Sequence, residues 1–388
     1  MRESNNLLVL TQNYTSYVKD PMDIISKNFN HVYVMVRYNP IANISDYVSI
    51  NSLKPFRKNS LINLTNKPEN LTVIPIAVPY LPTNYGYKKL GDQQLKIVNK
   101  IITKNKLDFD LIHSHFTWTS GYVGKKLKEI YEVPFILTVH ENQEWFLKEY
   151  HSKFEKIYDT WGSANAIIRV NKIDIPLLEQ FNKNIYYIPN GFSKEKFFRI
   201  DKTKAKNDLG IPNEKKVLFS LGLLIERKGF QYLIDAIKEV IVTHDNILCI
   251  IGGQGKIRTY LERKIKNLSL ADYVKLVGFI PDKNVNLWMN AADIFVLPSL
   301  SEGTPTVLFE ALGCGKPFVG TTVGGNSEII NSEDYGLLGK PADARDLAEK
   351  IVKSLDKKWD DEKIMEYSEN FTWTKIVEQI SDVYKKFI

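Results

Sequence analysis

Residues 299–317 read SLSEGTPTVLFEALGCGKP, and this stretch determines the fold class that the sequence predicts. Residues 294–297 before it form an apolar run of the length of a buried strand, which Pro298 ends. After it, Pro305 suits the first position of a helix, and an apolar stripe begins at Val307. The stretch therefore predicts a strand, a loop and a helix, the repeating unit of an α/β fold.

Two carboxylates of this unit, Glu302 and Glu310, are eight positions apart. Glu302 would lie on the loop at the carboxyl end of the strand, and Glu310 about two turns along the helix. The backbone N–H groups of residues 303–306 would then lie at the helix N-terminus, where they favour an anion or the oxygens of a ligand. The alternative is that Glu302 only decorates a loop and Glu310 a solvated helix face.

The chain has 388 residues, too many for one ordinary hydrophobic core, so its length predicts two domains. No apolar run approaches about 18 residues and the N-terminus lacks the pattern of a signal peptide, so we expect neither a transmembrane helix nor a leader. Cys249 and Cys314 stand far apart in apolar or Gly-rich surroundings, which indicates buried free thiols in a reducing compartment. The predicted location is therefore the cytoplasm.

The formal net charge of +7 is spread through isolated lysines, without a block of five like charges. This distribution favours an anionic small ligand or a membrane surface and argues against nucleic acid as a partner. Residues 42–68 form a long polar stretch with Arg57 and three lysines, which predicts a mobile basic loop near the acceptor. With residues 125–128, Lys-Lys-Leu-Lys, it gives the hypothesis of peripheral contact with the inner face of the cell membrane.

Short β-rich runs alternate with helix-length amphipathic segments along the whole chain, which predicts parallel sheets covered on both faces. The runs expected as strands in the first half are 7–10, 32–36, 71–76, 111–113, 135–139, 166–170 and 185–188. Those expected in the second half are 217–221, 247–251, 274–277, 294–297 and 318–321. We therefore predict an α/β fold of two Rossmann-like domains, residues 1–195 and 196–370, facing across a cleft, with a final helix at 371–388.

Two glycine-containing turns of the second half fall between a strand and a helix. The turn at 252–255, which includes Gly253, could bring backbone close to a phosphate, although it lacks the spacing of a dinucleotide fingerprint. The other turn begins at Gly222 and carries Arg227 and Lys228, two adjacent cations that could neutralise a diphosphate. The alternative for this second turn is an ordinary solvated loop.

Histidines and aromatic residues mark the first half. His113, His115 and His140 lie at predicted strand ends, but no carboxylate spacing completes a known ligand set, so we do not predict a metal. Asp108 and Asp110 are expected to cap the entry of a strand. Aromatic residues recur every four positions and predict one helical face, either core or a stacking surface for a sugar or lipid. These residues are Phe146, Tyr150, Phe154 and Tyr158, with Trp145 and Trp161 beside them.

The motif from Glu302 to Glu310 and its surroundings resemble family 4 of the retaining, nucleotide-sugar-dependent glycosyltransferases, which have the GT-B fold. Supporting matches occur in the family's order at 110–115, 139–140, 188–191, 228–229, 278–281, 292–293, 323–325 and 328. The resemblance covers residues 107–388, is strong from residue 188, and implies that the final helix, 371–388, crosses back onto the N-terminal domain. It implies that Glu310 binds the ribose hydroxyls, Glu302 a hydroxyl of the donor sugar, and Lys228 the diphosphate.

The resemblance also assigns roles to three further segments. Residues Gly303, Thr304, Pro305, Thr306 and Val307 would hold the sugar and phosphates, Gly278, Phe279 and Ile280 would edge the base, and His140 would meet the transferred sugar. Three departures from the family pattern stand out. Leu223 replaces an arginine, Glu141 replaces a glycine, and residues 11–14 replace a glycine-rich acceptor loop.

The expected activity is the metal-independent, retaining transfer of a hexose-type sugar from a UDP- or GDP-sugar to a glycan or lipid-linked glycan, without a cofactor. Catalysis is assigned to Glu302, Lys228 and His140. Two alternatives remain open at this point. One is a nucleotide-sugar epimerase of similar fold, and the other is a catalytically silent subunit that binds a sugar nucleotide.

Overall fold

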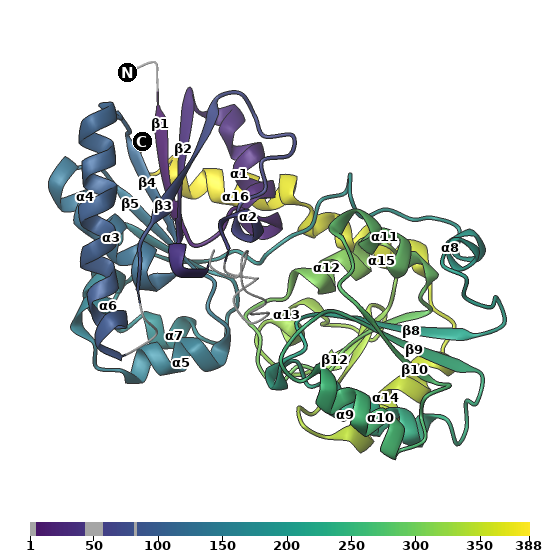
Figure 1. Ribbon diagram of the computed structural model, residues 1–388. Helices are drawn as coiled ribbons and strands as arrows, with labels where there is room; N and C mark the ends of the chain where they lie inside the picture. Colours follow the sequence, from purple (N-terminus) through teal and green to yellow (C-terminus); the bar gives the residue numbers. More distant parts are fainter. Residues whose placement is uncertain (1–4, 43–56, 81–83) are drawn as a thin grey trace. The chain divides into compact units, whose positions relative to one another are not determined.

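The computed structural model describes residues 5–42, 57–80 and 84–388, and the chain divides into two compact units (Figure 1). Unit 1 comprises Met1–Pro189 and Trp373–Ile388, and unit 2 comprises Asn190–Thr372. The predicted domain limits at 195 and 370 differ slightly from these. Phe192 is buried and its N–H donates to the Phe371 carbonyl at 3.0 Å, so residues 190–195 pack with unit 2.

Within the described residues, unit 1 contains a parallel sheet in the order β3-β2-β1-β4-β5-β6-β7. Apolar side chains alternate between its two faces. For example, the neighbouring residues Val34 and Met35 of β2 belong to two different hydrophobic cores. The strands are β1 (Asn6–Thr11), β2 (His31–Tyr38), β3 (Leu71–Ala77), β4 (Leu111–His115), β5 (Phe135–Val139), β6 (Ala166–Arg169) and β7 (Ile185–Tyr187).

Helices cover both faces of this sheet. One core includes residues of α3, α4 and α6, and the other includes residues of α1 and α16, the last helix of the chain (Figure 1). Tyr384 of α16 is buried and its hydroxyl bonds to Nδ1 of His113, which ties the end of the chain to β4. The helices are α1 (Ser16–Ile25), α2 (Lys58–Leu61), α3 (Asn84–Asn105), α4 (Tyr122–Tyr131), α5 (Gln143–His151), α6 (Glu155–Ser163), α7 (Ile175–Leu178) and α16 (Trp373–Tyr384).

The prediction of one aromatic helical face is wrong. Lys153 adopts a left-handed backbone conformation (φ 53°) and separates α5 from α6, so the four aromatic residues belong to two helices and the turn between them. Their rings nevertheless contribute to one core, in which Phe146 and Trp161 are fully buried, whereas Trp145 is 47% exposed.

The described part of unit 2 contains a second parallel sheet, in the order β10-β9-β8-β11-β12-β13. Its strands are β8 (Lys216–Leu221), β9 (Ile247–Gly252), β10 (Val274–Gly278), β11 (Ile294–Leu297), β12 (Phe318–Thr321) and β13 (Gly336–Gly339). Its helices are α8 (Lys202–Asp208), α9 (Phe230–Val240), α10 (Arg258–Asn267), α11 (Asp282–Ala291), α12 (Thr306–Gly313), α13 (Asn326–Ile329), α14 (Ala344–Asp356) and α15 (Asp361–Ser368). The predicted α/β class with two Rossmann-like domains is confirmed.

The strand order of each sheet shows where a ligand would bind. In parallel sheets of this type, ligands bind beyond the carboxyl ends of the strands, where the strand order reverses. That point lies between β1 and β4 in unit 1 and between β8 and β11 in unit 2. The stretch that follows β11 is the one that carries Glu302.

Two other expectations concern single residues and helices. Cys249 and Cys314 are both free and buried, as predicted. Among the helices of the described residues, none combines the length and apolarity needed to cross a membrane. Residues 43–56 of the predicted basic loop lie outside the described residues.

Candidate active site

Glu302 is the centre of a charged cluster at the carboxyl end of β11 in unit 2. Its Oε1 accepts hydrogen bonds from Lys228 Nζ and from Ser299 Oγ, each at 2.6 Å, and its Oε2 lies 3.2 Å from a guanidinium nitrogen of Arg227. Glu302 is only 5% exposed. Burial by itself would raise the pKa of Glu302, but the charges of Lys228 and Arg227 outweigh it and lower the pKa. The group is therefore an ionised, buried carboxylate and does not merely decorate a loop.

Gly229 allows the cationic loop to reach Glu302. It has a φ of +70°, and a Cβ there would collide with the carbonyl oxygen of Pro298. The Leu300 N–H donates to the Arg227 carbonyl at 2.7 Å, so the loop after β8 packs backbone to backbone against the end of β11. This contact holds Lys228 and Arg227 beside Glu302.

Gly253 has a similar part in the loop after β9. Its φ is +140°, and a Cβ would collide with the Gly222 carbonyl. The Gly222 N–H donates to the Gly252 carbonyl at 3.1 Å, and the Leu224 N–H donates to the Gln254 carbonyl at 2.9 Å. The glycine cluster therefore brings the backbone of the loop after β9 close to the loop after β8. The predicted contacts of Gly222 and Gly253 with a phosphate stay predictions.

The loop between Glu302 and α12 is fixed by other parts of unit 2. The Gly325 N–H donates to the Gly303 carbonyl at 2.6 Å, and Asn190 Nδ2 donates to the Thr304 carbonyl at 2.7 Å. Pro305 precedes the helix with an extended backbone (ψ 128°), so its predicted place as first helical residue is wrong. Residues 303–307 thus form a rigid approach to the N-terminus of α12.

Glu310 and Phe279 complete the predicted donor residues of unit 2. Glu310 is 9% exposed, which contradicts the alternative of a solvated helix face. Gly278 at the end of β10 has a φ of +81°, its carbonyl accepts the Gly253 N–H at 2.7 Å, and Ile280 is buried. Phe279 between them is 64% exposed, and such a ring could stack on a base.

His140 lies at the carboxyl end of β5 in unit 1. Its Nε2 is 2.9 Å from Nδ1 of His115, with the two rings stacked at 12°, and the rings of Tyr17 and Phe116 flank it. Burial lowers the pKa of His115 to about 3 and that of His140 well below its ordinary value, so both imidazoles are neutral. Within the part of the chain that the structure describes, no group of three or more His, Cys, Asp or Glu side chains is arranged to hold a metal.

Comparison with known proteins identifies the family. The family "Glycosyl transferases group 1" matches residues 201–371, and "Glycosyltransferase Family 4" matches residues 60–196. An uncharacterized glycosyltransferase of Methanocaldococcus jannaschii is 31% identical over 325 residues, which are 82% of this chain and 86% of that protein. The chain belongs to the glycosyl transferases group 1. The resemblance inferred from the sequence is confirmed.

Solved structures agree with the fold of this glycosyltransferase. Sucrose-phosphate synthase of Thermosynechococcus elongatus has a TM-score of 0.77 and 19% identity, covering 98% of this chain and 99% of that chain. The Anabaena protein HepE, solved in complex with UDP and glucose, has a TM-score of 0.73 and 20% identity, covering 98% and 100%. At these identities the likeness concerns the fold, and it supports the GT-B assignment.

Sequence reasoning named Glu141 of this glycosyltransferase but missed the buried polar residues around it, Glu149, Arg169 and Asp174. Glu141 accepts the Thr117 N–H at 2.7 Å, while both side-chain oxygens of Glu149 are buried without a hydrogen-bond partner. Arg169 is fully buried and donates to the Glu141 carbonyl at 2.9 Å and to Asp174. Glu149 stands three positions after the buried Phe146 in α5, and that spacing could have placed it on the inner face of the helix.

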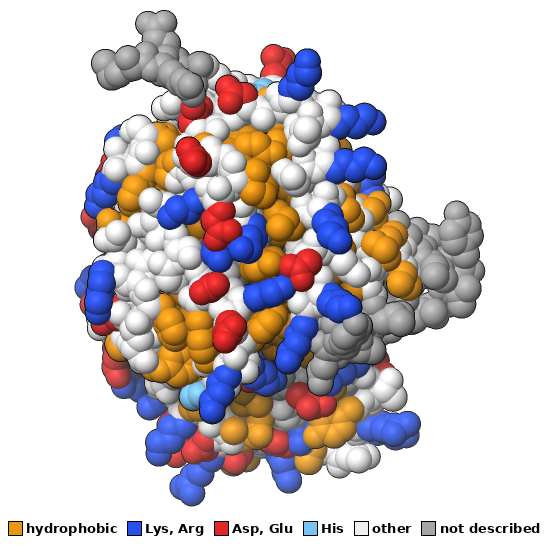
Figure 2. All heavy atoms as spheres, turned by 90° about the vertical axis from the view of Figure 1, so that its left-hand side faces the viewer, with side chains coloured by type: hydrophobic (Ala, Val, Ile, Leu, Met, Phe, Trp, Pro, Cys, Tyr) orange, Lys and Arg blue, Asp and Glu red, His pale blue; other side chains and the backbone are white. Residues whose placement is uncertain are grey.

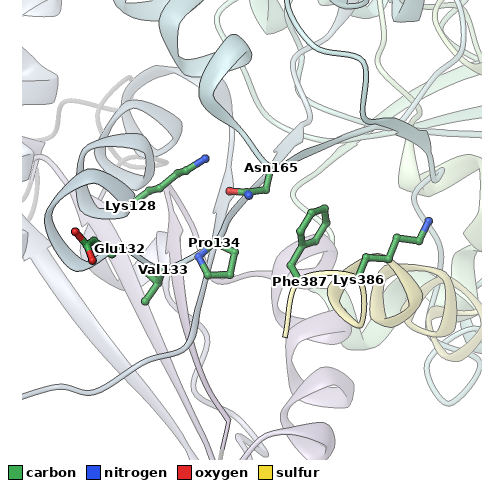
Figure 3. A pocket seen from close by; sticks show the side chains of 7 residues that line it. All are labelled: Lys128, Glu132, Val133, Pro134, Asn165, Lys386 and Phe387. Atoms are coloured by element: carbon green, nitrogen blue, oxygen red, sulfur yellow. The ribbon is translucent and has the colours of Figure 1, made fainter.

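A hollow of about 460 Å³ lies at the amino ends of β5 and β6. Figure 3 shows that its residues come from the end of α4, the segments before the two strands, and the end of the chain. The lining residues are Lys128, Glu132, Val133, Pro134, Asn165, Lys386 and Phe387. Because ligands of such sheets bind at the carboxyl ends, this hollow is separate from the candidate active site.

Proposed function

We propose that this glycosyltransferase transfers a hexose-type sugar from a UDP- or GDP-sugar with retention of configuration and without a metal. The observation that carries the proposal is the convergence of Lys228 and Arg227 on the buried carboxylate of Glu302. Two cations facing one carboxylate leave an excess positive charge, which a diphosphate would neutralise. The UDP bound in the HepE structure supports a nucleotide as the ligand of such a unit.

The proposed reaction occurs on one face of the sugar. The bond from the anomeric carbon to the diphosphate oxygen breaks, the bond to the acceptor oxygen forms on the same face, and the leaving diphosphate takes the acceptor's proton. Lys228, aided by Arg227, would stabilise the charge that grows on the leaving group. Preorganised donors of this kind are worth about 2.7 to 4 kcal/mol each.

Glu302 and His140 would hold the transferred sugar. Once the diphosphate draws Lys228 and Arg227 toward itself, the carboxylate of Glu302 can accept a hydrogen bond from a sugar hydroxyl. A neutral His140 can donate or accept a hydrogen bond without adding charge near the anomeric carbon. Glu310 is proposed to bind the ribose hydroxyls, and residues 278–280 to edge the base.

The proposed acceptor is a glycan or lipid-linked glycan, with peripheral contact to an anionic membrane surface. Lys125 pairs with Glu129 and Asp159, and Lys126 pairs with Glu129, so two carboxylates neutralise these two lysines of the predicted basic patch. Helix α3 supports the proposal better, because its exposed positions carry several lysines and Asp92 is the only acidic residue in its sequence. Figure 2 shows basic side chains spread over the surface on this side, among acidic and apolar ones.

Nucleotide binding tests the donor half of the proposal. Lys228→Met should lose most of the thermal stabilisation that UDP, GDP or their sugars give the wild type, because ligand binding raises stability by mass action. Lys256→Met is a matched control, since Lys256 is 70% exposed and pairs with Glu226 in the same region. Equal stabilisation of both variants would refute the proposed diphosphate site.

Incubation with the donor alone tests the reaction. A transferase should need an acceptor for rapid turnover. An epimer formed from the donor alone would favour the epimerase. Unchanged pathway function in a cell that carries Glu302→Ala and Lys228→Ala would favour the silent subunit.

A further inference from the structure

Arg37 is a cationic side chain at the carboxyl edge of the unit 1 sheet that the proposed function does not use. It is the penultimate residue of β2, and the alternation of the strand places it on the same face as Met35, above the core that α3 covers. Its Nε is buried and has no hydrogen-bond partner. Within the described ranges of the chain, Arg37 forms no ion pair.

The ring of Tyr80 lies next to this guanidinium, and Tyr87 interacts with it electrostatically. The Arg37 Cζ lies 5.5 Å from the centre of the Tyr80 ring, and Asn39 Nδ2 donates to the Tyr80 carbonyl at 2.9 Å, which holds the segment after β3 in place. Tyr87 in the first turn of α3 is held by Trp118, whose Nε1 donates to the Tyr87 carbonyl at 3.1 Å. Both tyrosines pack against the same core as Met35.

The charges around Tyr87 fit a hydrogen-bond donor. Burial raises the pKa of Tyr87, the charges of Glu149 and Glu141 raise it further, and Arg37 opposes them, so the phenol keeps its proton. Burial also raises the pKa of Glu141 and Glu149, which favours their uncharged forms. An anion next to Arg37 would therefore meet a cation, and the nearby Tyr87 keeps its proton as a hydrogen-bond donor.

The Nε of Arg37 is a buried donor without a hydrogen-bond partner, which costs free energy that a ligand can recover. The guanidinium is planar and always charged, and its fork matches the two oxygens of a phosphate or carboxylate. β2 is next to β1, beside the point where the strand order reverses, so Arg37 lies at the edge where this sheet would bind a ligand.

We propose that Arg37, with Tyr80 and Tyr87, forms an anion subsite that takes a phosphate or carboxylate group of the acceptor. The inference rests on the proposed function, because it assigns unit 1 to the acceptor. It narrows the acceptor to molecules with an anionic group, either soluble or attached to a lipid.

The test measures anion binding while unit 2 is saturated with the nucleoside diphosphate that it binds best. The soluble probes are inorganic phosphate and glucose 6-phosphate, with glucose as the neutral comparison. The lipid probe is a phosphatidylcholine vesicle with about one tenth polyprenyl phosphate, compared with phosphatidylcholine alone. The proteins are wild type, Arg37→Leu, Arg37→Lys and the control Arg263→Leu, which replaces an exposed arginine of α10 in unit 2.

We expect Arg37→Leu to weaken binding of the preferred anionic probe at least tenfold, Arg37→Lys about threefold, and Arg263→Leu not at all. Loss on glucose 6-phosphate would identify a soluble acceptor, and loss only on vesicles a lipid-linked one. The proposal is wrong if no probe binds in an Arg37-dependent manner, or if Lys228→Met alone abolishes binding. Nucleoside diphosphate affinity should be unchanged in Arg37→Leu, which shows that the variant is folded and separates this result from failure of the proposed donor site.

Discussion

Glu302→Gln separates the two roles proposed for the buried carboxylate of this glycosyltransferase, as counter-charge to two cations and as acceptor of a sugar hydroxyl. The substitution keeps the shape of the side chain and removes its charge. In the protein without donor, Lys228 and Arg227 then lose their counter-charge. This loss is costly because water reaches the two cations poorly: the side chain of Lys228 is 13% exposed and that of Arg227 is 24% exposed. With a nucleoside diphosphate bound, the phosphates supply that counter-charge.

The size of the effect follows from the contact distances. The 2.6 Å pair between Lys228 and Glu302 has a Coulomb energy of about 6 kcal/mol at an effective dielectric constant of about 20, before desolvation is subtracted. Removing one partner of a buried pair costs about 3 to 5 kcal/mol. Partial exposure of both cations reduces this to about 2 to 4 kcal/mol, which lowers the Tm of a unit of this size by roughly 5 to 15 °C.

The same substitution should strengthen product binding and slow transfer. UDP or GDP should bind Glu302→Gln at least about tenfold more tightly than wild type, which corresponds to about 1.4 kcal/mol. Transfer should be about tenfold to a hundredfold slower, because a hydrogen bond from a sugar hydroxyl to a charged group is lost. Titration calorimetry measures the nucleotide affinity, thermal unfolding measures the Tm, and initial rates measure the speed of transfer.

Glu226→Gln is the matched control, because Glu226 lies in the same loop as Lys228 and its side chain is 74% exposed. It removes the same charge but should change none of the three quantities appreciably. Weaker nucleotide binding by Glu302→Gln, of the size seen in Lys228→Met, would refute the argument that the carboxylate competes with phosphate for the cations.

Three further substitutions test other parts of the structure. Burial raises the pKa of Glu149, so the stability that its protonation supplies is complete below its unfolded pKa of about 4.3 and is lost as the pH rises through the folded pKa. Glu149→Gln should therefore raise the Tm at pH 8 but not at pH 4.5. The control Glu155→Gln, at an exposed position, should leave the Tm unchanged at both pH values. Gly253→Ala should destabilise unit 2 by more than about 1 kcal/mol and weaken nucleotide binding, measured by denaturant unfolding and calorimetry, because its Cβ would collide with the carbonyl of Gly222. Leu223→Arg, at an exposed position of the same loop, should tighten nucleoside diphosphate binding by up to about tenfold in calorimetry, and no gain would show that this position does not face the phosphates.

Every segment predicted as a strand is one, because continuous apolar runs bounded by turn residues are a local signal for the buried strands of parallel sheets. β13 was not predicted because this local signal is weak there: its sequence Gly-Leu-Leu-Gly has two glycines and little preference for a strand. The prediction of one aromatic helical face was wrong because the spacing of four residues continues across Lys153. The left-handed backbone conformation of Lys153 ends the helix there, and no pattern of side chains indicates it.

A motif is enough to name the residues of the proposed donor site, but it does not predict which of them pair. Lys228 and Glu302 are 74 positions apart, and their contact depends on how two loops pack after the sheet has formed. Arg37 and Glu149 show the opposite failure. Each occupies a position that the strand or helix period marks as inward, where a charged residue is an exception.

A physical reason explains why unit 2, the proposed donor unit, is easier to recognise in sequence than unit 1, the proposed acceptor unit. The loops of unit 2 touch through backbone atoms, and at Gly229 and Gly253 a side chain would collide with a neighbouring carbonyl, so only glycine fits. Such a constraint fixes residue type and spacing together, and that combination is a motif. At the carboxyl edge of unit 1 the contacts join side chains, as between His115 and His140 or Arg37 and Tyr80. Many residue types can make side-chain contacts, so this edge can change its ligand without changing its fold, and its specificity has to be inferred from individual charges.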